Sequence, residues 1–360
     1  MIFNNWESKK LGEVCKIKYG KDHKHLSDGN IPVYGSGGIM RFADTSLYTK
    51  KSVLIPRKGS LKNLYFVETP FWTVDTLFYT EIDETKIVPE FLFYQLKNLD
   101  LAGMNVGTAV PSLTTAVLNE IYIILPSLEV QKEIANILSS LDNKIANNIK
   151  INKCLEEMAQ AVFKSWFKND NSNNWQTTTL GQITVELRNK VNSLDCKVLS
   201  AVKTGNLTLS EEYFTKRVFS KNISKYILVE PLDFAYNPSR VNIGSLGINN
   251  LNILGCVSPV YKVFRAKDKY HNFLNLFFKS NNFIEEVKTR ASGSVRQSLS
   301  HEDFSLIKLK LPPLDVVIEF NNIYDLIQSM INQALSENNK LIEIRDSLLP
   351  KLISGEISIK

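Results

Sequence analysis

The chain has 360 residues, of which 44% are hydrophobic and 22% are charged, and it carries a formal net charge of +6. This composition is typical of a globular protein, and the length allows two domains that each bury a core of their own. No run approaches about 18 consecutive apolar residues and the opening MIFNNWESKK lacks an apolar stretch, so we expect neither a membrane span nor a secretory signal.

Residues 1–126 form the first predicted domain. Short runs of β-branched and aromatic residues, such as KSVLIP and TLFYTEI, predict strands, while PEFLFYQLKNL predicts a short helix. The domain is therefore expected to be α+β with a β-dominated core. Residues 9–62 contain twelve Lys and Arg against four Asp and Glu, whereas residues 63–126 contain two against eight. The basic half is compatible with a phosphate-facing surface, and solvated surface lysines are the alternative.

Residues 127–168 form a long predicted helix that follows a Leu-Pro step and contains no internal Gly or Pro. Strict 3-4 spacing along this helix predicts the seam of a coiled coil. The seam positions are Leu138, Leu141, Ile145, Asn148, Asn152, Leu155, Ala159, Val162 and Trp166. Residues 169–174 are polar and form the predicted linker.

Residues 175–312 form the second predicted domain, and residues 313–360 form a second long helix with a carboxy-terminal tail. Residues 175–311 contain nineteen Lys and Arg against eleven Asp and Glu. The second helix has seam positions at the same phase: Tyr324, Ile327, Ile331, Ala334, Asn338, Leu341, Arg345 and Leu348. A buried Asn at a seam fixes the register, because a slipped pairing leaves its amide without a partner. The alternatives are a surface-leaning position for Asn152 and Asn338, and packing of each helix on its own domain.

The second half of the chain repeats the first. LPSLEVQKEIANIL (residues 125–138) returns as LPPLDVVIEFNNIY (residues 311–324), a shift of 186 residues. The shift is 169 where Leu11-Gly12 returns as Leu180-Gly181, and 185 where Gly59-Ser60-Leu61 returns as Gly244-Ser245-Leu246. This period is far too long for a solenoid. It indicates a duplicated domain-plus-helix whose second domain is about seventeen residues longer in its middle.

The repeat predicts a geometry. Each long helix of about 40 residues spans about 60 Å, which exceeds the width of either domain. The simplest pairing of the seams is antiparallel, which places the two domains at opposite ends of a coiled coil with pseudo-two-fold symmetry. On duplex DNA, with about 34 Å per turn, such a pair of helices separates two contact regions by about one to two turns.

In these features the sequence resembles the specificity subunit of type I restriction–modification enzymes. The resemblance rests on IPVYGSGGI (31–39), the two Leu-Pro openings, CLEEMAQAVFKSWF (154–167) and RDSLLPKLISGEI (345–357), and it covers essentially the whole chain. It implies two target-recognition domains separated by two long helices, which read a bipartite target in double-stranded DNA. It also implies partners: two modification (methyltransferase) subunits and, in the full complex, restriction (motor and nuclease) subunits. The longer second domain departs from equal halves and implies an asymmetric target.

The sequence offers no motif for chemistry of its own. The phosphate-binding pattern G-x-x-x-x-G-K-[ST] is absent, and YGSGG (34–38) is interpreted as a tight turn. YNPSR (236–240) shares only Asn-Pro with the motif by which DNA methyltransferases hold a flipped base. The four cysteines are scattered without a C-x-x-C pair, which favours reduced thiols in a cytoplasmic protein over a metal site. We therefore expect a non-catalytic subunit without cofactor or metal.

Base readout requires donors such as Arg and Lys on positioned loops, and phosphate anchoring requires cations. The candidates in the first domain are Lys21, Lys24, Tyr34, Arg41, Lys50, Lys51, Arg57 and Lys58. Those in the second domain are Lys203, Lys216, Arg217, Arg240, Arg290 and Arg296. Arg57 and Arg240 each precede the shared Gly-Ser-Leu, which suggests a common DNA-facing element. A solvated surface charge is the alternative for each cation, and a core role is the alternative for Tyr34.

Large apolar residues outside the seams exceed what a two-helix seam requires, so we expect them to bind the modification subunits. They are Ile134, Ile137, Met158, Phe163, Phe167, Phe320, Met330, Leu335 and Leu349. The alternative function is a coiled-coil scaffold that has lost DNA recognition. Such a scaffold would not show the steep salt dependence of a DNA-binding protein.

Overall fold

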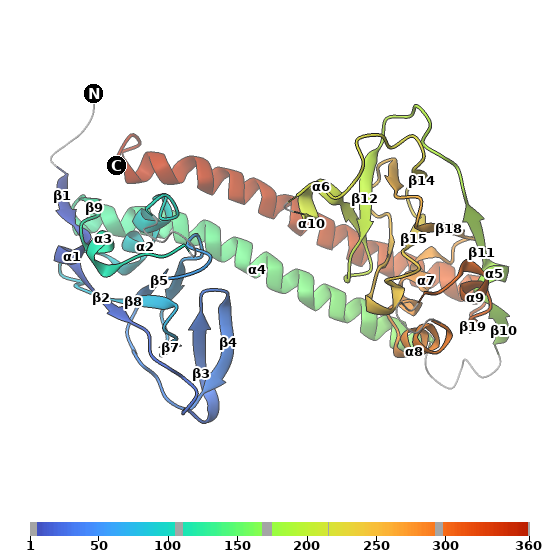
Figure 1. Ribbon diagram of the computed structural model, residues 1–360, viewed down its shortest axis with the longest axis horizontal. Helices are drawn as coiled ribbons and strands as arrows, with labels where there is room; N and C mark the ends of the chain where they lie inside the picture. Colours follow the sequence, from blue (N-terminus) through green and yellow to red (C-terminus); the bar gives the residue numbers. More distant parts are fainter. Residues whose placement is uncertain (1–5, 105–110, 168–174, 215, 292–297, 359–360) are drawn as a thin grey trace. The chain divides into compact units, whose positions relative to one another are not determined.

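The structure is a computed structural model that describes residues 6–104, 111–167, 175–214, 216–291 and 298–358. It divides into two compact units (Figure 1). Unit 1 comprises Met1–Lys150 with Ala334–Lys360, and unit 2 comprises Ile151–Gln333. Each long helix therefore contributes part of its length to each unit, a division that differs from the consecutive domains predicted from the sequence. The predicted linker, residues 169–174, lies outside the described residues.

Within its described residues, unit 1 contains three small sheets. The first pairs β1 (Glu7–Lys10) with β9 (Tyr122–Leu125) in antiparallel register. The second has the order β2 (Cys15–Tyr19), β8 (Leu77–Ile82), β5 (Ser52–Pro56) and β6 (Tyr65–Val67). The third has the order β4 (Gly38–Ala43), β3 (Asp28–Gly35) and β7 (Trp72–Thr73).

In the part of this domain that the structure describes, the short helices are α1 (Leu11–Val14), α2 (Pro89–Lys97) and α3 (Thr115–Asn119). Pro89 occupies the first turn of α2, where its missing N–H has no helical partner to lose. Phe91 and Leu92 of α2 are fully buried in the core beneath β5 and β8. The α+β class predicted from the sequence is confirmed.

Unit 2 has the same kinds of element. One sheet pairs β10 (Gln176–Thr179) with β19 (Lys308–Leu311). Another has the order β11 (Thr184–Leu187), β18 (Lys262–Ala266), β15 (Phe234–Tyr236) and β16 (Leu246–Ile248). A further sheet of unit 2 has the order β13 (Leu207–Leu209), β12 (Lys197–Ala201), β17 (Gly255–Val257) and β14 (Ile227–Val229). Its helices are α5 (Leu180–Ile183), α6 (Ser210–Tyr213), η2 (Val241–Ile243), α7 (His271–Phe277), α8 (Asn281–Arg290) and α9 (His301–Ser305).

The pairing of strands shows that the units are copies of one design. Glu7 pairs with Leu125 at the base of unit 1, and Gln176 pairs with Leu311 at the base of unit 2. The Leu-Gly steps that the repeat aligned begin α1 and α5 at the end of these strands. In each unit a hairpin follows, β3–β4 or β12–β13, whose first strand also pairs in parallel with β7 or β17.

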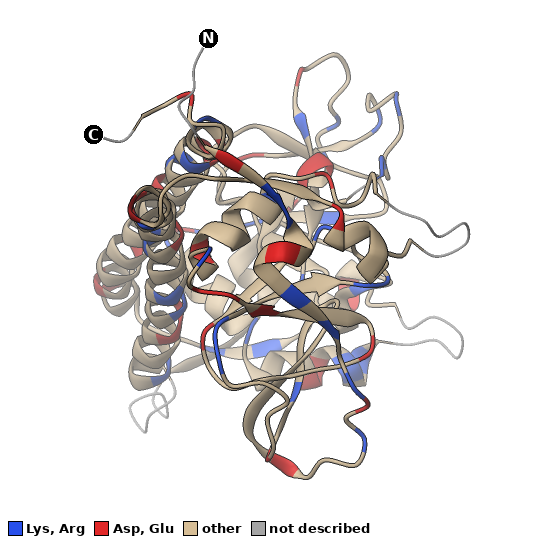
Figure 2. Cartoon of the chain, turned by 90° about the vertical axis from the view of Figure 1, so that its left-hand side faces the viewer, with Lys and Arg blue, Asp and Glu red and all other residues tan. Residues whose placement is uncertain are grey.

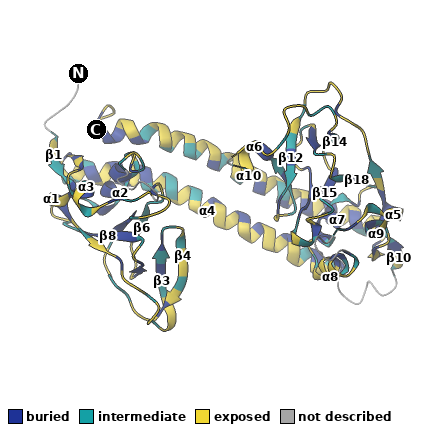
Figure 3. Cartoon of the chain, viewed as in Figure 1, coloured by how far each residue is buried: buried dark blue, intermediate teal, exposed yellow. Residues whose placement is uncertain are grey.

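The two long helices are α4 (Leu128–Phe167) and α10 (Leu314–Ile353). Each carries buried residues along one side and exposed residues along the other (Figure 3). Every seam position predicted from the 3-4 spacing is buried or half-buried in the structure. The seam in unit 1 is antiparallel, because Asn148 contacts Asn338 whereas Asp142, which precedes Asn148 in α4, contacts Arg345, which follows Asn338 in α10.

The seam of unit 1 contains polar residues that pair with one another. Asn148 is 2% exposed and Asn338 is 6% exposed, and Nδ2 of Asn148 donates to Oδ1 of Asn338 at 2.9 Å. Nη1 of Arg345 donates to Asp142 at 2.7 Å, and the hydroxyl of Tyr94 in α2 donates to the same carboxylate at 2.8 Å. Burial raises the pKa of Asp142, but the hydrogen bonds from Arg345 and Tyr94 and the charge of Lys97 outweigh it, so this pKa lies below the ordinary value.

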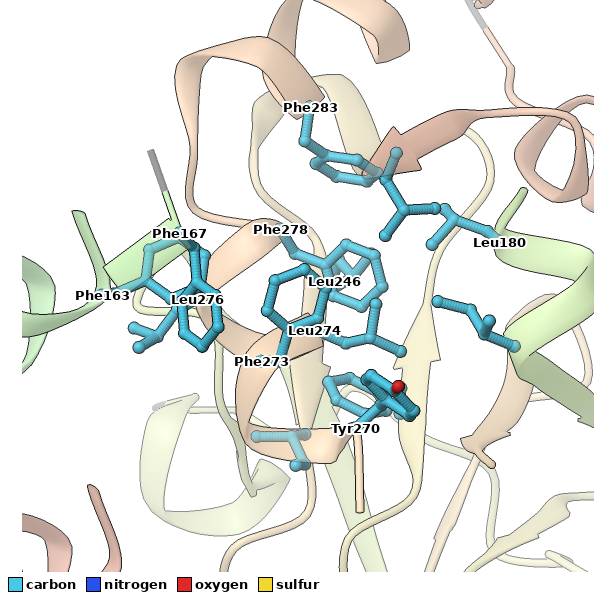
Figure 4. Close-up of a cluster of buried hydrophobic side chains, with 14 of the residues drawn as sticks. Phe163, Phe167, Leu180, Leu246, Tyr270, Phe273, Leu274, Leu276, Phe278 and Phe283 are labelled. Atoms are coloured by element: carbon cyan, nitrogen blue, oxygen red, sulfur yellow. The ribbon is translucent and has the colours of Figure 1, made fainter. Parts of the chain in front are cut away.

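An aromatic core fills unit 2 where both long helices meet the domain (Figure 4). Phe167 lies 4.9 Å from Phe320 and 5.1 Å from Phe273 between ring centroids, both in edge-on geometry. Phe163 lies 5.8 Å from Phe273, which belongs to α7. Edge-on aromatic pairs of this kind contribute beyond the area they bury. Unit 2 is therefore held together by rings from α4, α7 and α10.

This packing corrects part of the predicted partner surface. Five of the nine predicted residues are buried within their own unit: Ile134 and Leu349 in unit 1, and Phe163, Phe167 and Phe320 in unit 2. The prediction is wrong for these five because each helix packs on its domain as well as on the other helix. A second apolar stripe of each helix is therefore buried within its own unit. Ile137, Met158, Met330 and Leu335 are exposed.

Candidate nucleic-acid interface

The loop that precedes each Gly-Ser-Leu is the same structural element in both units. In unit 1 it follows β5, and in unit 2 it follows β15. Gly59 has φ +87° and Gly244 has φ +91°, a left-handed backbone that glycine adopts without strain. Leu61 and Leu246 then enter the cores. The repeat in the sequence therefore reflects a shared left-handed turn that leads into a buried leucine.

A second segment braces this loop from behind. The backbone N–H of Leu113 donates to the carbonyl of Arg57 at 2.9 Å, and that of Leu299 donates to the carbonyl of Pro238 at 3.1 Å. Thr114 and Ser300 directly follow these leucines, and each caps the next short helix with its side-chain oxygen. The two hydrogen bonds make Pro238, and not Arg240, the structural counterpart of Arg57.

The loop of unit 2 is consequently longer than that of unit 1. Two steps along the chain lead from Arg57 to Gly59, whereas six lead from Pro238 to Gly244. The additional residues form η2, and Arg240 precedes that turn with its side chain exposed. The prediction that Arg57 and Arg240 share a loop is thus supported, but the two arginines do not occupy equivalent positions.

The turn of the hairpin lies beside the same loop. In unit 1 the Ser36 carbonyl of the turn accepts hydrogen bonds from Asn63 at 3.0 Å and Tyr65 at 3.1 Å. A Cβ built on Gly59 would lie 3.5 Å from Oγ of Ser36. In unit 2 a Cβ on Gly244 would lie 3.5 Å from Cα of Lys203, which stands in the β12–β13 turn. The position next to the glycine is therefore a serine in one unit and a lysine in the other.

Open cavities adjoin these turns. In unit 1 a cavity of about 720 Å³ is lined by Lys24, Ser36, Met40 and Asp75, among others. In unit 2 a cavity of about 530 Å³ is lined by Lys203, Asn242 and Lys279. Burial lowers the pKa of Lys279, a residue that the sequence did not single out. Its position is set by the end of α7, which no local sequence signal connects to Lys203.

Several of the predicted cations are already compensated by carboxylates of their own unit. Arg41 contacts Asp28 at 2.8 Å, and Arg290 contacts Glu286 at 2.8 Å. Lys51 bridges Glu68 and Glu90, and the pKa of Lys51 is raised chiefly by its hydrogen bond with Glu90. The charges of these three residues are thus paired within their own unit, and their role as DNA contacts stays a prediction.

Other predicted cations are exposed and have no carboxylate partner within the described residues. They are Lys21, Lys24, Lys50, Lys58, Lys203, Lys216 and Arg240. Lys and Arg are interspersed with Asp and Glu along the elements in view rather than gathered on one of them (Figure 2). Arg296 lies outside the described residues. Tyr34 packs against Phe71 and Tyr65, and burial raises the pKa of its hydroxyl, which favours the core alternative.

Arg57 and Arg217 are each stacked on an aromatic ring. The guanidinium of Arg57 lies 5.3 Å from the ring centroid of Tyr19, and its Nη1 donates to the Asp75 carbonyl at 3.1 Å. The guanidinium of Arg217 lies 4.6 Å from the ring centroid of Phe219, and its Nη2 donates to the carbonyl of Ser220 at 3.4 Å. Sequence reasoning missed both rings, because spacing along the chain does not reveal which aromatic faces a given arginine.

The described residues show neither a metal site nor a membrane span. Over the described ranges, no group of three or more His, Cys, Asp and Glu residues is arranged to hold a metal ion. No helix in that part of the chain is long and apolar enough to cross a bilayer.

Known proteins share both the sequence pattern and the fold. Residues 4–157 match the family model described as type I restriction modification DNA specificity domain. The type I restriction enzyme MjaIX specificity subunit of Methanocaldococcus jannaschii is 22% identical, over 100% of this chain and 95% of that protein. The HindI specificity subunit of Haemophilus influenzae is 24% identical, over 81% of each chain. The crystal structure of a type I restriction-modification S subunit from M. genitalium superposes with a TM-score of 0.67 at 16% identity, covering 98% of both chains.

Proposed function

We propose that this chain, which belongs to the type I restriction–modification DNA specificity family, is the subunit that selects the DNA target of such a complex. Each unit would read one half of a bipartite, asymmetric sequence in double-stranded DNA. The chain would act where the chromosome lies, in the cytoplasm, and it would leave methylation and cleavage to the subunits it binds.

The duplicated loop is the observation that carries this proposal. A left-handed glycine, a bracing Ser-Leu segment and a hairpin turn recur in both units, while the cations displayed at the loop differ: Arg57 and Lys58 in unit 1, Arg240 in unit 2. Two copies of one scaffold with different exposed donors are suited to reading two different short sequences. An exposed glycine-rich turn also allows a close approach of the backbone to phosphate.

The exposed sides of the long helices support the docking of protein partners. In unit 2 Ile323, Leu326 and Met330 follow helical spacing on α10, and Leu326 is 64% exposed. Met158 is exposed on α4 of the same unit. In unit 1 Ile137 and Leu335 are exposed. We propose that these residues contact two modification subunits, one at each unit, and that restriction subunits join through them.

Exchange of one domain provides the test of the proposal. The chain is expressed with its modification subunits, and methylated adenines in the host genome are mapped by sequencing. One split motif is expected, and replacing residues 6–125 with the corresponding domain of another specificity subunit should change one half of it. A replacement that changes both halves, or neither, contradicts the proposal.

Salt dependence separates DNA reading from a pure scaffold role. The affinity of the complex for duplex DNA should fall steeply as salt rises, because each neutralised phosphate releases counterions. The purified chain alone, incubated with DNA and a labelled methyl donor, should incorporate no label. Salt-independent binding would favour the scaffold.

A further inference from the structure

We propose that Arg57 and Arg217 are specificity-determining residues, each reading one guanine, with Arg57 serving the half-site of unit 1 and Arg217 that of unit 2. The inference rests on the proposed function, since it assigns a base to residues of the same interface. It goes beyond that function by naming which of the many cations recognise sequence and which base they recognise.

The fixed orientation of Arg57 is the first reason. Its guanidinium lies over the ring of Tyr19, and Nη1 is held by the backbone carbonyl of Asp75. Among the described residues no carboxylate forms an ion pair with it. A cation–π contact and one backbone hydrogen bond restrain the guanidinium plane without neutralising its charge. The remaining N–H donors stay free to bind a ligand.

This restraint suits guanine in particular. In the major groove guanine presents two acceptors, O6 and N7, and the planar fork of arginine matches that pair in a bidentate contact. Such a contact discriminates well when the fork is oriented before binding, because little side-chain entropy is lost. An unrestrained lysine offers a point charge and suits phosphate instead. Lys58, the exposed next residue, represents that second type.

The surroundings of Arg57 place it among the other candidate contacts. The same Asp75 lines the cavity that also contains Lys24, Ser36 and Met40. The carbonyl of Thr76 accepts the backbone N–H of Arg57 at 2.8 Å, which anchors the loop to the strand β8 region. Tyr19 is 51% exposed, and its ring contacts Phe78 edge-on.

In unit 2 Arg217 is restrained in the same way as Arg57, by an aromatic ring and a backbone carbonyl, although it lies in a different loop. Its guanidinium lies over Phe219 and donates to the Ser220 carbonyl. The loop that carries it is hydrogen-bonded to the segment after β11, where Asn192 N–H donates to the carbonyl of Ser224 at 2.9 Å. That segment corresponds in the repeat to the basic stretch after β2, which contains Lys24. Arg240, by contrast, contacts no aromatic ring among the described residues.

Matched substitutions test the reading of the first half. The wild-type complex first defines the motif by methylation sequencing of the host genome. Arg57→Lys keeps the charge and loses the fork, Tyr19→Leu removes the ring, and Tyr19→Phe keeps it. We expect Arg57→Lys and Tyr19→Leu to relax one guanine position of the first half, with discrimination there falling roughly 10-fold to 100-fold. Tyr19→Phe should leave the motif unchanged, whereas Lys58→Gln should weaken binding equally on all sequences, as the loss of a phosphate contact does.

The second half is tested by Arg217→Lys and Phe219→Leu, with Phe219→Tyr as the control that retains the ring. Duplexes with a single 7-deazaguanine, which lacks the N7 acceptor, then locate each contact in binding assays with the whole complex. The wild-type complex should bind more weakly when 7-deazaguanine replaces one particular guanine in each half. The corresponding lysine variant, which already binds the unmodified duplex more weakly, should lose no further affinity from that replacement. Circular dichroism shows whether each variant is folded.

Three results would overturn the assignment while leaving the proposed function intact. The motif could lack guanine in the relevant half, the lysine variants could keep full discrimination, or they could weaken binding equally on all sequences, which marks a phosphate contact. A wild-type complex that methylates no split motif would instead refute the proposed function, and this inference would fall with it.

Discussion

Replacing Asn338 with alanine removes the acceptor that the buried amide of Asn148 uses inside the seam of unit 1. Nδ2 of Asn148 retains Glu337 as a second acceptor at 2.7 Å, but the contact across the seam is lost. Loss of one buried hydrogen bond, with an amide left partly unpaired, costs about 1–3 kcal/mol. Asn147→Ala, on the exposed side of the same helix turn, is the control and should change stability by less than about 0.5 kcal/mol.

The double substitution Asn148→Leu with Asn338→Leu should act in the opposite direction. It removes both amides together, so no buried polar group is left without its partner, and each leucine adds buried apolar surface worth about 1.5–3 kcal/mol. A variant more stable than wild type would show that the asparagines specify the pairing of the helices rather than supply stability.

Urea unfolding followed by circular dichroism measures these differences as shifts of the midpoint at constant slope. Equal midpoints for Asn338→Ala and Asn147→Ala would contradict the seam assignment. A double leucine variant less stable than Asn338→Ala would refute the interpretation of the pair as a register device.

Three further predictions follow from the packing. Asp142→Asn should cost about 1–3 kcal/mol, because the half-buried Arg345 then keeps only Asp346 as a charged partner and Tyr94 loses its charged acceptor. Because the pKa of Asp142 is lowered in the fold, the stabilisation by its carboxylate is complete above about pH 4 and is lost on further acidification, so urea midpoints of the variant should depend less on pH in that range. Phe320→Ala, at a ring with 0% exposure, should cost about 3–5 kcal/mol in thermal or urea unfolding. Gly244→Ala should cost about 1–2 kcal/mol, because a Cβ is strained at φ +91°, whereas Gly37→Ala, which meets no atom within 4 Å, should be nearly neutral in the same assay.

The seam was predictable because its signal is local and periodic. Spacing alone identified Asn148, Asn338 and Arg345 as inward-facing, since a 3-4 repeat sustained over four heptads admits one buried stripe. The 3-4 spacing does not show how α4 and α10 pack on the domains. Whether Phe163 meets solvent or α7 depends on a contact between residues more than a hundred positions apart, which periodicity does not encode. For this reason the sequence predicts a partner surface at nine apolar residues outside the seams, although five of them are buried in their own unit.

In the candidate interface, too, local features were predictable from the sequence and tertiary contacts were not. Gly59 and Gly244 were identifiable from the repeat, because a left-handed turn demands glycine in both copies. The compensation of Lys51 by Glu90, or of Arg41 by Asp28, depends on which strands and helices become neighbours, so composition could not remove them from the candidates. That Arg57 and Arg240 both precede the shared Gly-Ser-Leu did not reveal their different backbone positions, because the loop of the second copy is longer.

The location of the added residues bears on why the two halves would read different sequences. The strands that form the base of each unit, and the Ser-Leu segment behind each loop, keep their pairing in both copies. The second copy grows instead at the surface, in the loop containing η2 and in the segment around Arg217 between β13 and β15. Insertions in surface loops cost little stability, because loop-closure entropy rises slowly with length. A scaffold that tolerates such changes can acquire a new readout in one unit without disturbing the other, which is the behaviour that the domain exchange measures.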